Sequence, residues 1–208
     1  MTSSFRNEFM MNLIQLVLIF TLTSFFSAPA FAQPNSSELE VVVNTTKNFS
    51  QSDLEKLHQA TVMVQEIVNT TEFKDRVINF VYQNQKTFVQ NNGLSNEQIY
   101  SLLMSGAKKY PVATPANHVM DFDLELFKPK LFQGNVLGYT SSSTSLISIN
   151  QKFYRSSAVY EVAMNLVHEW THKMGFEHDF NYTARRDYSV PYAVGYMIRD
   201  IGKLMSGK

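Results

Sequence analysis

The chain has 208 residues, of which 18 are basic and 18 acidic, so its formal net charge at pH 7 is zero. No basic run accompanies this balance, which argues against nucleic acid or an anionic membrane as a partner. Because the chain contains no cysteine, disulfide bonds cannot cross-link it, and its stability must come from its core and from any bound metal.

The first 32 residues have the pattern of an export signal. A mostly apolar run from Leu13 to Phe26 is followed by Ala30-Phe31-Ala32, an A-x-A cleavage site before Gln33. The run is short and interrupted by polar residues, which argues against a permanent membrane span, and no later segment is apolar for long enough. We therefore predict a signal peptide over 1–32 and an exported protein, secreted or periplasmic, with one domain over 33–208.

Local patterns predict the elements of that domain in chain order. We expect a strand over 38–44, a long helix from Ser52 or Asp53 to Val68, a second helix over 72–88, a turn at 91–93, and a short helix opened by a capping box at Ser95 and Gln98. A loop at 111–115 precedes strands over 118–127, 135–139 and 145–150, a helix over 157–174, a turn at 187–191 and a last helix over 192–205. This order indicates an α+β fold with a mixed sheet packed on helices.

Three of the five histidines lie within residues 168–178, which read H-E-x-x-H-x-x-G-x-x-H with every fixed position filled. His168 and His172, four apart on a helix, point from one face and can share a metal ion. Gly175 can adopt a positive φ and stop the helix, which lets the chain bring round His178 as a third ligand. Three neutral nitrogen ligands with one open position indicate a catalytic Zn²⁺ site.

Glu169 is the candidate catalytic residue, because it lies one position past the first ligand, where its carboxylate can reach a metal-bound water without replacing it. A cluster of surface histidines satisfied by water is the alternative, and it leaves Gly175 unexplained. His58 and His118 carry no such spacing, and we interpret them as ordinary helix or strand residues.

Over these eleven residues the chain resembles the metzincin clan of zinc metallopeptidases. The resemblance implies that His168, His172 and His178 bind zinc and that Glu169 is the general base. It also implies a twisted sheet whose edge strand lies along the cleft and binds substrate by strand addition, with residues 135–139 as the candidate edge. The implied function is that of a secreted zinc endopeptidase, a monomer that cleaves peptide or protein substrates.

One feature departs from the family. Metzincins carry a methionine turn beneath the metal, whereas here residues 188–190 (Tyr-Ser-Val) are followed by Pro191 and Tyr192. Either Met197 lies beneath the metal, or a substituted turn at Val190 and Pro191 takes that place; we favour the substituted turn. Tyr188 or Tyr192 either stabilises an oxyanion or is a packed aromatic.

Other readings stay open. A metal-bearing binding protein that has lost hydrolysis is possible, although the intact Glu169 argues against it, and so is a non-peptidase hydrolase of cell-wall amides. Asp179 either orients a ligand or is a solvated loop residue, and the specificity pocket is expected within 179–193. With no cysteine and a first strand close to the predicted cleavage point, we expect no inhibitory propeptide.

Overall fold

The computed structural model describes residues 38–129 and 136–207. The predicted signal peptide over 1–32, its cleavage point at Ala32/Gln33, and Asn135 lie outside these residues. In chain order, the elements are β1 Glu40–Lys47, α1 Gln51–Val68, α2 Thr71–Ile78, α3 Asn96–Ser105, β2 Val119–Phe127, β3 Gly138–Thr140, β4 Leu146–Asn150, α4 Gln151–Ser156, α5 Val159–Lys173, the 3₁₀ turn η1 Arg186–Tyr188, and α6 Val190–Met205.

The four strands form one mixed sheet in the order β1-β2-β4-β3. β1, β2 and β4 are parallel, whereas β3 runs antiparallel to β4 at the edge. Within residues 38–129 and 136–207, six α-helices accompany this sheet, an arrangement compatible with the predicted α+β class. None of these helices is both long and apolar enough to cross a membrane.

The alternation predicted for residues 118–127 is confirmed in β2. Its apolar side chains, Met120, Phe122, Leu124 and Leu126, are buried, while the acidic residues between them are partly exposed. The buried face packs on the helices, and the Phe122 ring meets the indole of Trp170 on α5 edge-on at a centroid distance of 5.8 Å. The alternation of apolar and acidic residues along β2 therefore determines which face of the sheet packs against α5.

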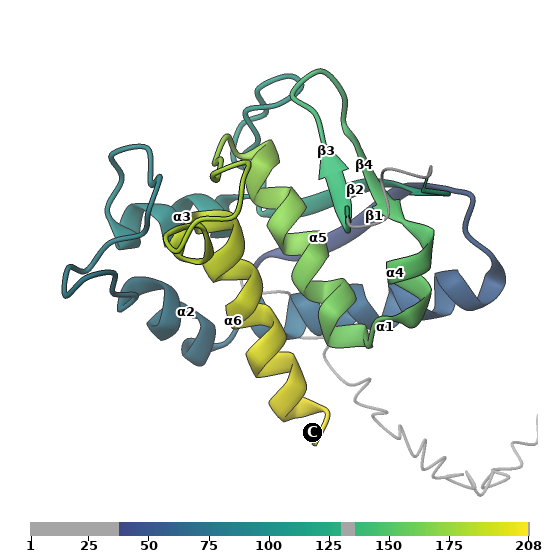
Figure 1. Ribbon diagram of the computed structural model, residues 1–208, viewed down its shortest axis with the longest axis horizontal. Helices are drawn as coiled ribbons and strands as arrows, with labels where there is room; N and C mark the ends of the chain where they lie inside the picture. Colours follow the sequence, from purple (N-terminus) through teal and green to yellow (C-terminus); the bar gives the residue numbers. More distant parts are fainter. Residues whose placement is uncertain (1–37, 130–135, 208) are drawn as a thin grey trace, which may run out of the picture. The chain divides into compact units, whose positions relative to one another are not determined.

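Helix α5 lies among the other elements of the domain. It packs against α1, α6 and the edge strand β3, and Figure 1 shows it running beside α6. The approach to α6 is close at Gly195, where a Cβ atom would come within 3.3 Å of the Met164 carbonyl oxygen and 3.5 Å of the His168 Cβ. A side chain at this position would hold the two helices apart.

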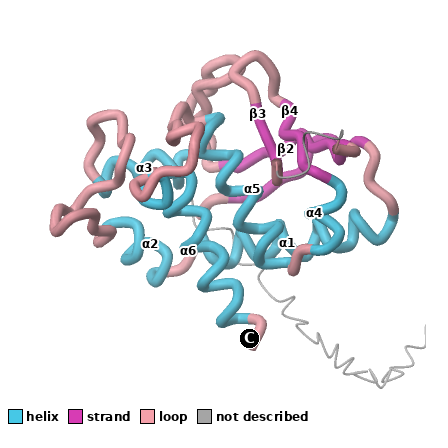
Figure 2. Tube along the Cα trace, viewed as in Figure 1, coloured by secondary structure: helices cyan, strands magenta, loops and turns pink. Residues whose placement is uncertain are grey.

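Two helix predictions need correction. The predicted helix over 72–88 is wrong beyond Ile78, where α2 ends and a loop begins (Figure 2). Gln83 and Asn84 have φ values of +49° and +62°, and the backbones of Tyr82 and Gln85 exchange two hydrogen bonds of 2.9 Å. This turn brings Phe80 and the buried Phe88 into a stack with a centroid distance of 4.2 Å, a tertiary contact that overrides helical periodicity.

Helix α4 was not predicted, because its six residues are too few to show a helical period. Its N-cap is Asn150, whose side chain accepts from the Lys152 N–H at 3.0 Å. The start of α1 is also corrected: Ser50 is the N-cap, and the Asp53 carboxylate accepts from the Ser50 N–H at 2.9 Å. The capping box of Ser95 and Gln98 on α3 is confirmed.

Candidate metal centre

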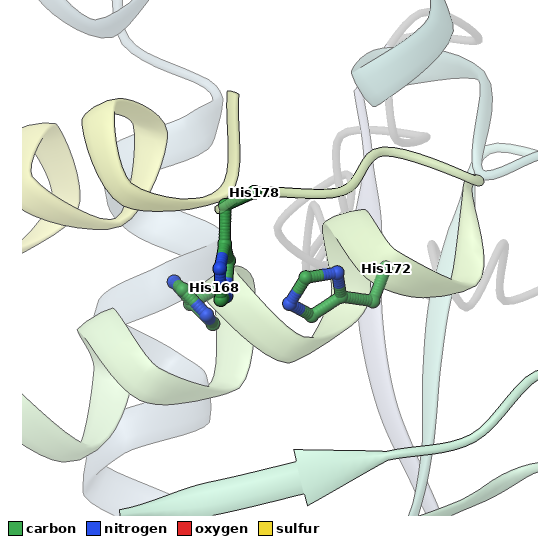
Figure 3. Close-up of side chains that lie close together, drawn as sticks. All are labelled: His168, His172 and His178. Atoms are coloured by element: carbon green, nitrogen blue, oxygen red, sulfur yellow. The ribbon is translucent and has the colours of Figure 1, made fainter. Parts of the chain in front are cut away.

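The end of α5 brings the three motif histidines together. Helical hydrogen bonding stops at Gly175, which has a φ of +95° and donates its N–H to the His172 carbonyl at 3.0 Å. An alanine at this φ would be strained, so glycine is the residue that lets the chain reverse here. Figure 3 shows His168 and His172 projecting from one face of the helix and His178 approaching from the following loop.

Ring nitrogens of His168, His172 and His178 all lie within 4.8 Å of one another. A tetrahedral zinc ion with Zn–N distances of about 2.1 Å holds its nitrogen ligands about 3.4 Å apart, so small side-chain movements would complete such a shell. The three histidines are therefore close enough to hold a metal ion. His58 and His118 do not belong to this group.

Backbone carbonyls orient the rings. Nδ1 of His172 lies 2.7 Å from the Phe176 carbonyl oxygen, and Nδ1 of His178 lies 3.0 Å from that of Asp179. His168 is hydrogen-bonded to the carbonyl of Pro191. A ring that donates Nδ1–H to a carbonyl keeps the lone pair of Nε2 for a metal, which is the usual arrangement around histidine ligands.

Burial keeps two of the ligands uncharged. It lowers the pKa of His168 well below 6.5 and that of His172 to about 4, with the other histidines contributing in the same direction. The neutral imidazole is the form that binds a metal. The donor set, its orientation and its protonation state therefore fit a divalent transition-metal ion such as zinc.

Glu169 is only 3% exposed and faces the edge strand. A Cβ atom on Gly138 of β3 would come within 3.1 Å of Glu169 Oε1, so the absence of a side chain there lets the strand approach the carboxyl. Burial raises the pKa of Glu169 to about 8, while the charge of Lys173 and a hydrogen bond from Asn165 act in the opposite direction. The result is a carboxyl able to take and release a proton near neutral pH.

The segment after η1 lies against the histidines. The Tyr192 ring meets those of His168 and His178 at centroid distances of 4.6 and 4.8 Å. Tyr188 instead packs on Phe80 and Tyr82, away from the cluster. Met197 lines a separate pocket, between α2 and α6. The Pro191 carbonyl and the Tyr192 ring are thus the parts of this segment that contact the ligands.

The side chain of Asp179 holds the loop that carries His178, while its backbone carbonyl lies against the His178 ring. Its two carboxylate oxygens accept from Gln90 Nε2 at 3.1 Å and Thr183 Oγ1 at 2.5 Å. From the same segment as Gln90, the Asn92 amide donates to the Gly175 carbonyl at 3.0 Å. Gln90, just before the predicted turn at 91–93, and Asn92 within that turn therefore support the loop on which His178 lies.

A cavity of about 270 Å³ lies along the first half of α5, and neither Glu169 nor any of the three histidines lines it. Its lining residues lie outside 179–193, whereas the pocket between α2 and α6 is lined in part by Asp187, Tyr188 and Ala193 of that range. Asn165, which hydrogen-bonds Glu169, forms part of the wall of the cavity along α5, together with Leu137 just before Gly138. The wall is otherwise mainly apolar and aromatic, with Glu161 and Arg199 as its charged members; the remaining lining residues are Ile149, Phe153, Tyr154, Ser157, Val162, Met164 and Tyr196.

Three residues near the centre were not identified from the sequence as site residues. Asn165 lies one helical turn before Glu169, and Gly138 lies on a different element. Arg186, within the range 179–193 where the specificity pocket was expected, places its guanidinium 4.4 Å from the centroid of the Tyr192 ring. None has a motif position: Gly138 and Arg186 reach the site through tertiary packing, whereas Asn165 lies near Glu169 through the helical spacing of α5. The sequence offered one signal for Asn165: a polar residue four positions before Glu169 lies on the same face of the helix.

Comparisons with protein-family models, with curated proteins and with solved structures found no match to this chain.

Proposed function

We propose that the protein is an exported zinc-dependent endopeptidase of metzincin type. The observation that carries the proposal is the placement of the buried Glu169 carboxyl between the histidine-bearing helix and an edge strand. A protein that only carries metal has no need of a buried carboxyl with a raised pKa at this point. The edge strand β3, antiparallel to its neighbour, agrees with the substrate-binding strand that the family resemblance implies.

His168, His172 and His178 would hold the ion, which when bound supplies Lewis acidity and lowers the pKa of a coordinated water to about 7. Glu169 accepts a proton from the attacking water, whose oxygen bonds to the carbon of the scissile carbonyl. As the C–N bond breaks, Glu169 returns the proton to the departing amine. Burial suits this role, because it holds the carboxyl in one position.

The substrate would lie along β3 as an added strand. In the described part of the chain β3 pairs only with β4, through Gly138 to Thr140, so its other edge offers free backbone groups. The cavity lined by Leu137 and Asn165, one helical turn before Glu169, would then receive a side chain of the added strand. Its apolar and aromatic wall favours a long aliphatic or aromatic side chain, and this preference is part of the proposal.

The test is cleavage of a mixed peptide library by the purified protein loaded with one equivalent of Zn²⁺, with cut sites read by mass spectrometry. Glu169→Gln should retain the metal and lose at least about a thousandfold in kcat. Glu97→Gln makes the same chemical change in an exposed side chain on α3 and should behave as wild type. Cleavage should stop on chelation, and the cut sites should share an apolar residue at one flanking position.

Wild-type activity in Glu169→Gln would refute the mechanism. One tightly bound zinc per chain without cleavage of any peptide would favour the alternative of a metal-bearing binding protein. Including cell-wall peptide fragments among the substrates separates the third reading, because hydrolysis of those amides alone would indicate a non-peptidase amide hydrolase.

A further inference from the structure

Lys173 is a buried charged residue that the mechanism above does not use. It is the last residue of α5 and only 2% exposed. Its Nζ donates a hydrogen bond to the Ser141 carbonyl oxygen at 3.1 Å and another to the Thr144 carbonyl oxygen. Ser141 and Thr144 belong to the turn between β3 and β4, so the side chain joins the end of the histidine-bearing helix to the end of the edge strand.

This turn has little else to hold it. Residues 141–145 are Ser-Ser-Ser-Thr-Ser, all exposed, and they offer no apolar side chain to the core. Within the turn, the Thr144 N–H reaches the Ser141 carbonyl at 3.4 Å, and the Ser143 N–H reaches Ser141 Oγ at 3.2 Å. These bonds shape the turn but do not fix it to another element. Both bonds between its carbonyls and α5 come from Lys173.

The other end of β3 is attached separately. Asn150 donates its side-chain amide to the Val136 carbonyl at 2.9 Å and its backbone N–H to the Leu137 carbonyl at 2.8 Å. Between the two attachments, Gly138 lies against Glu169. The strand itself is thus paired with β4 from Gly138 to Thr140, and the turn that follows it is held to α5 by Lys173.

Stability alone does not account for a lysine at this position. Burying an ammonium group costs free energy, and an apolar side chain of similar length would fill the space without that cost. Burial lowers the pKa of Lys173; the acidic groups of Glu169 and Asp123 favour the charged form, and the charge of Lys108 opposes it. The backbone of Lys173 does not need the side chain, because its carbonyl accepts from the Lys109 and Tyr110 N–H groups at 2.8 and 3.0 Å. What the ammonium group adds is a directed bond to two loop carbonyls.

We propose that Lys173 is a positioning residue. Its ammonium group holds the β3–β4 turn against α5 and so fixes the position of β3 relative to Glu169, where an extended substrate would meet this carboxyl. The inference rests on the proposed peptidase function for its consequence in catalysis. The clamp itself is a property of the free protein and is measured without substrate.

Hydrogen exchange followed by mass spectrometry tests the clamp. Lys173→Met keeps the length of the side chain and removes the donors, and amides of residues 140–146 should then exchange about tenfold faster or more, with and without zinc. Lys173→Arg, which restores charged donors, should recover most of the protection. The matched control is Lys56→Met, since Lys56 Nζ also donates to three carbonyls, those of Tyr154, Arg155 and Ser157, at 2.9 to 3.2 Å. That variant should leave residues 140–146 unchanged.

Kinetics tests the consequence. For a long peptide that can pair along β3, KM should rise about tenfold in Lys173→Met while kcat stays within about twofold; a short peptide that does not reach β3 should be cleaved as by wild type. Unchanged protection of residues 140–146 overturns the proposal, and so does an equal loss of kcat for both peptides. If wild type cleaves nothing, the proposed function fails while the exchange result still decides the clamp. If Lys173→Met does not fold, Lys173→Gln serves for the same comparison.

Discussion

Replacing Glu169 by glutamine should change how the stability of the metal-free protein depends on pH. In the folded chain the pKa of Glu169 is about 8, against 4.5 for an ordinary glutamate. Between these values the unfolded chain gives up a proton that the folded chain keeps. Stability therefore falls as pH rises through this range, and at about 1.36 kcal/mol for each pKa unit the full effect is about 5 kcal/mol. No such loss occurs in Glu169→Gln.

The titration of the histidines determines the pH range in which the effect of Glu169 on stability is best measured. The pKa of His172 falls from 6.5 to about 4 on folding, so the unfolded chain binds a proton that the folded chain does not, and stability rises with pH between these values. Below pH 6.5 this rise in stability with pH opposes the fall in stability that Glu169 causes. Between pH 6.5 and 8.5 the remaining rise from each histidine is less than about 1 kcal/mol, whereas Glu169 should remove about 2 kcal/mol.

The assay is urea unfolding of both proteins in a metal chelator at several pH values. The difference in the free energy of unfolding between Glu169→Gln and wild type isolates this one carboxyl, because contributions common to both cancel. It should widen by about 2 kcal/mol in favour of the variant from pH 6.5 to 8.5. A constant difference over that interval would show that the carboxyl is already ionised in the folded protein, and the argument from its burial would be wrong.

Three further outcomes follow from the contacts described above. Gly175→Ala should lose about 1–3 kcal/mol of stability, because its φ is +95°, and should weaken metal binding by displacing His178; urea unfolding and metal titration measure the two effects. Asp53→Asn should cost about 2 kcal/mol at pH 7 by breaking the 2.7 Å pair with Arg155. Because that pair lowers the pKa of Asp53, the difference should shrink as pH falls below 3.8, and its persistence at pH 2 would contradict the assignment. Zinc at a hundred times its dissociation constant should stabilise the wild type by about 2.7 kcal/mol, and a chelator should abolish the gain.

The elements that the sequence predicted well are those whose signal is local. The alternation of β2 and the capping box at Ser95 each depend on residues within one element, and both are confirmed. The predicted helix over 72–88 failed because the same apolar residues satisfy a stack of Phe80 on Phe88 from a loop, and periodicity cannot distinguish the two. Helix α4 has too few residues to carry a period.

The sequence by itself determined the candidate metal centre: the helical repeat places His168 and His172 on one face, and glycine permits the turn that returns His178. Spacing along one segment is enough for this, because all three ligands lie within eleven residues. Only the tertiary structure decided what surrounds them. The bare Gly138 that admits the strand and the Lys173 bond to the β3–β4 turn each join α5 to another element through packing. No period or motif encodes such contacts, since they depend on where the edge strand lies against the helix.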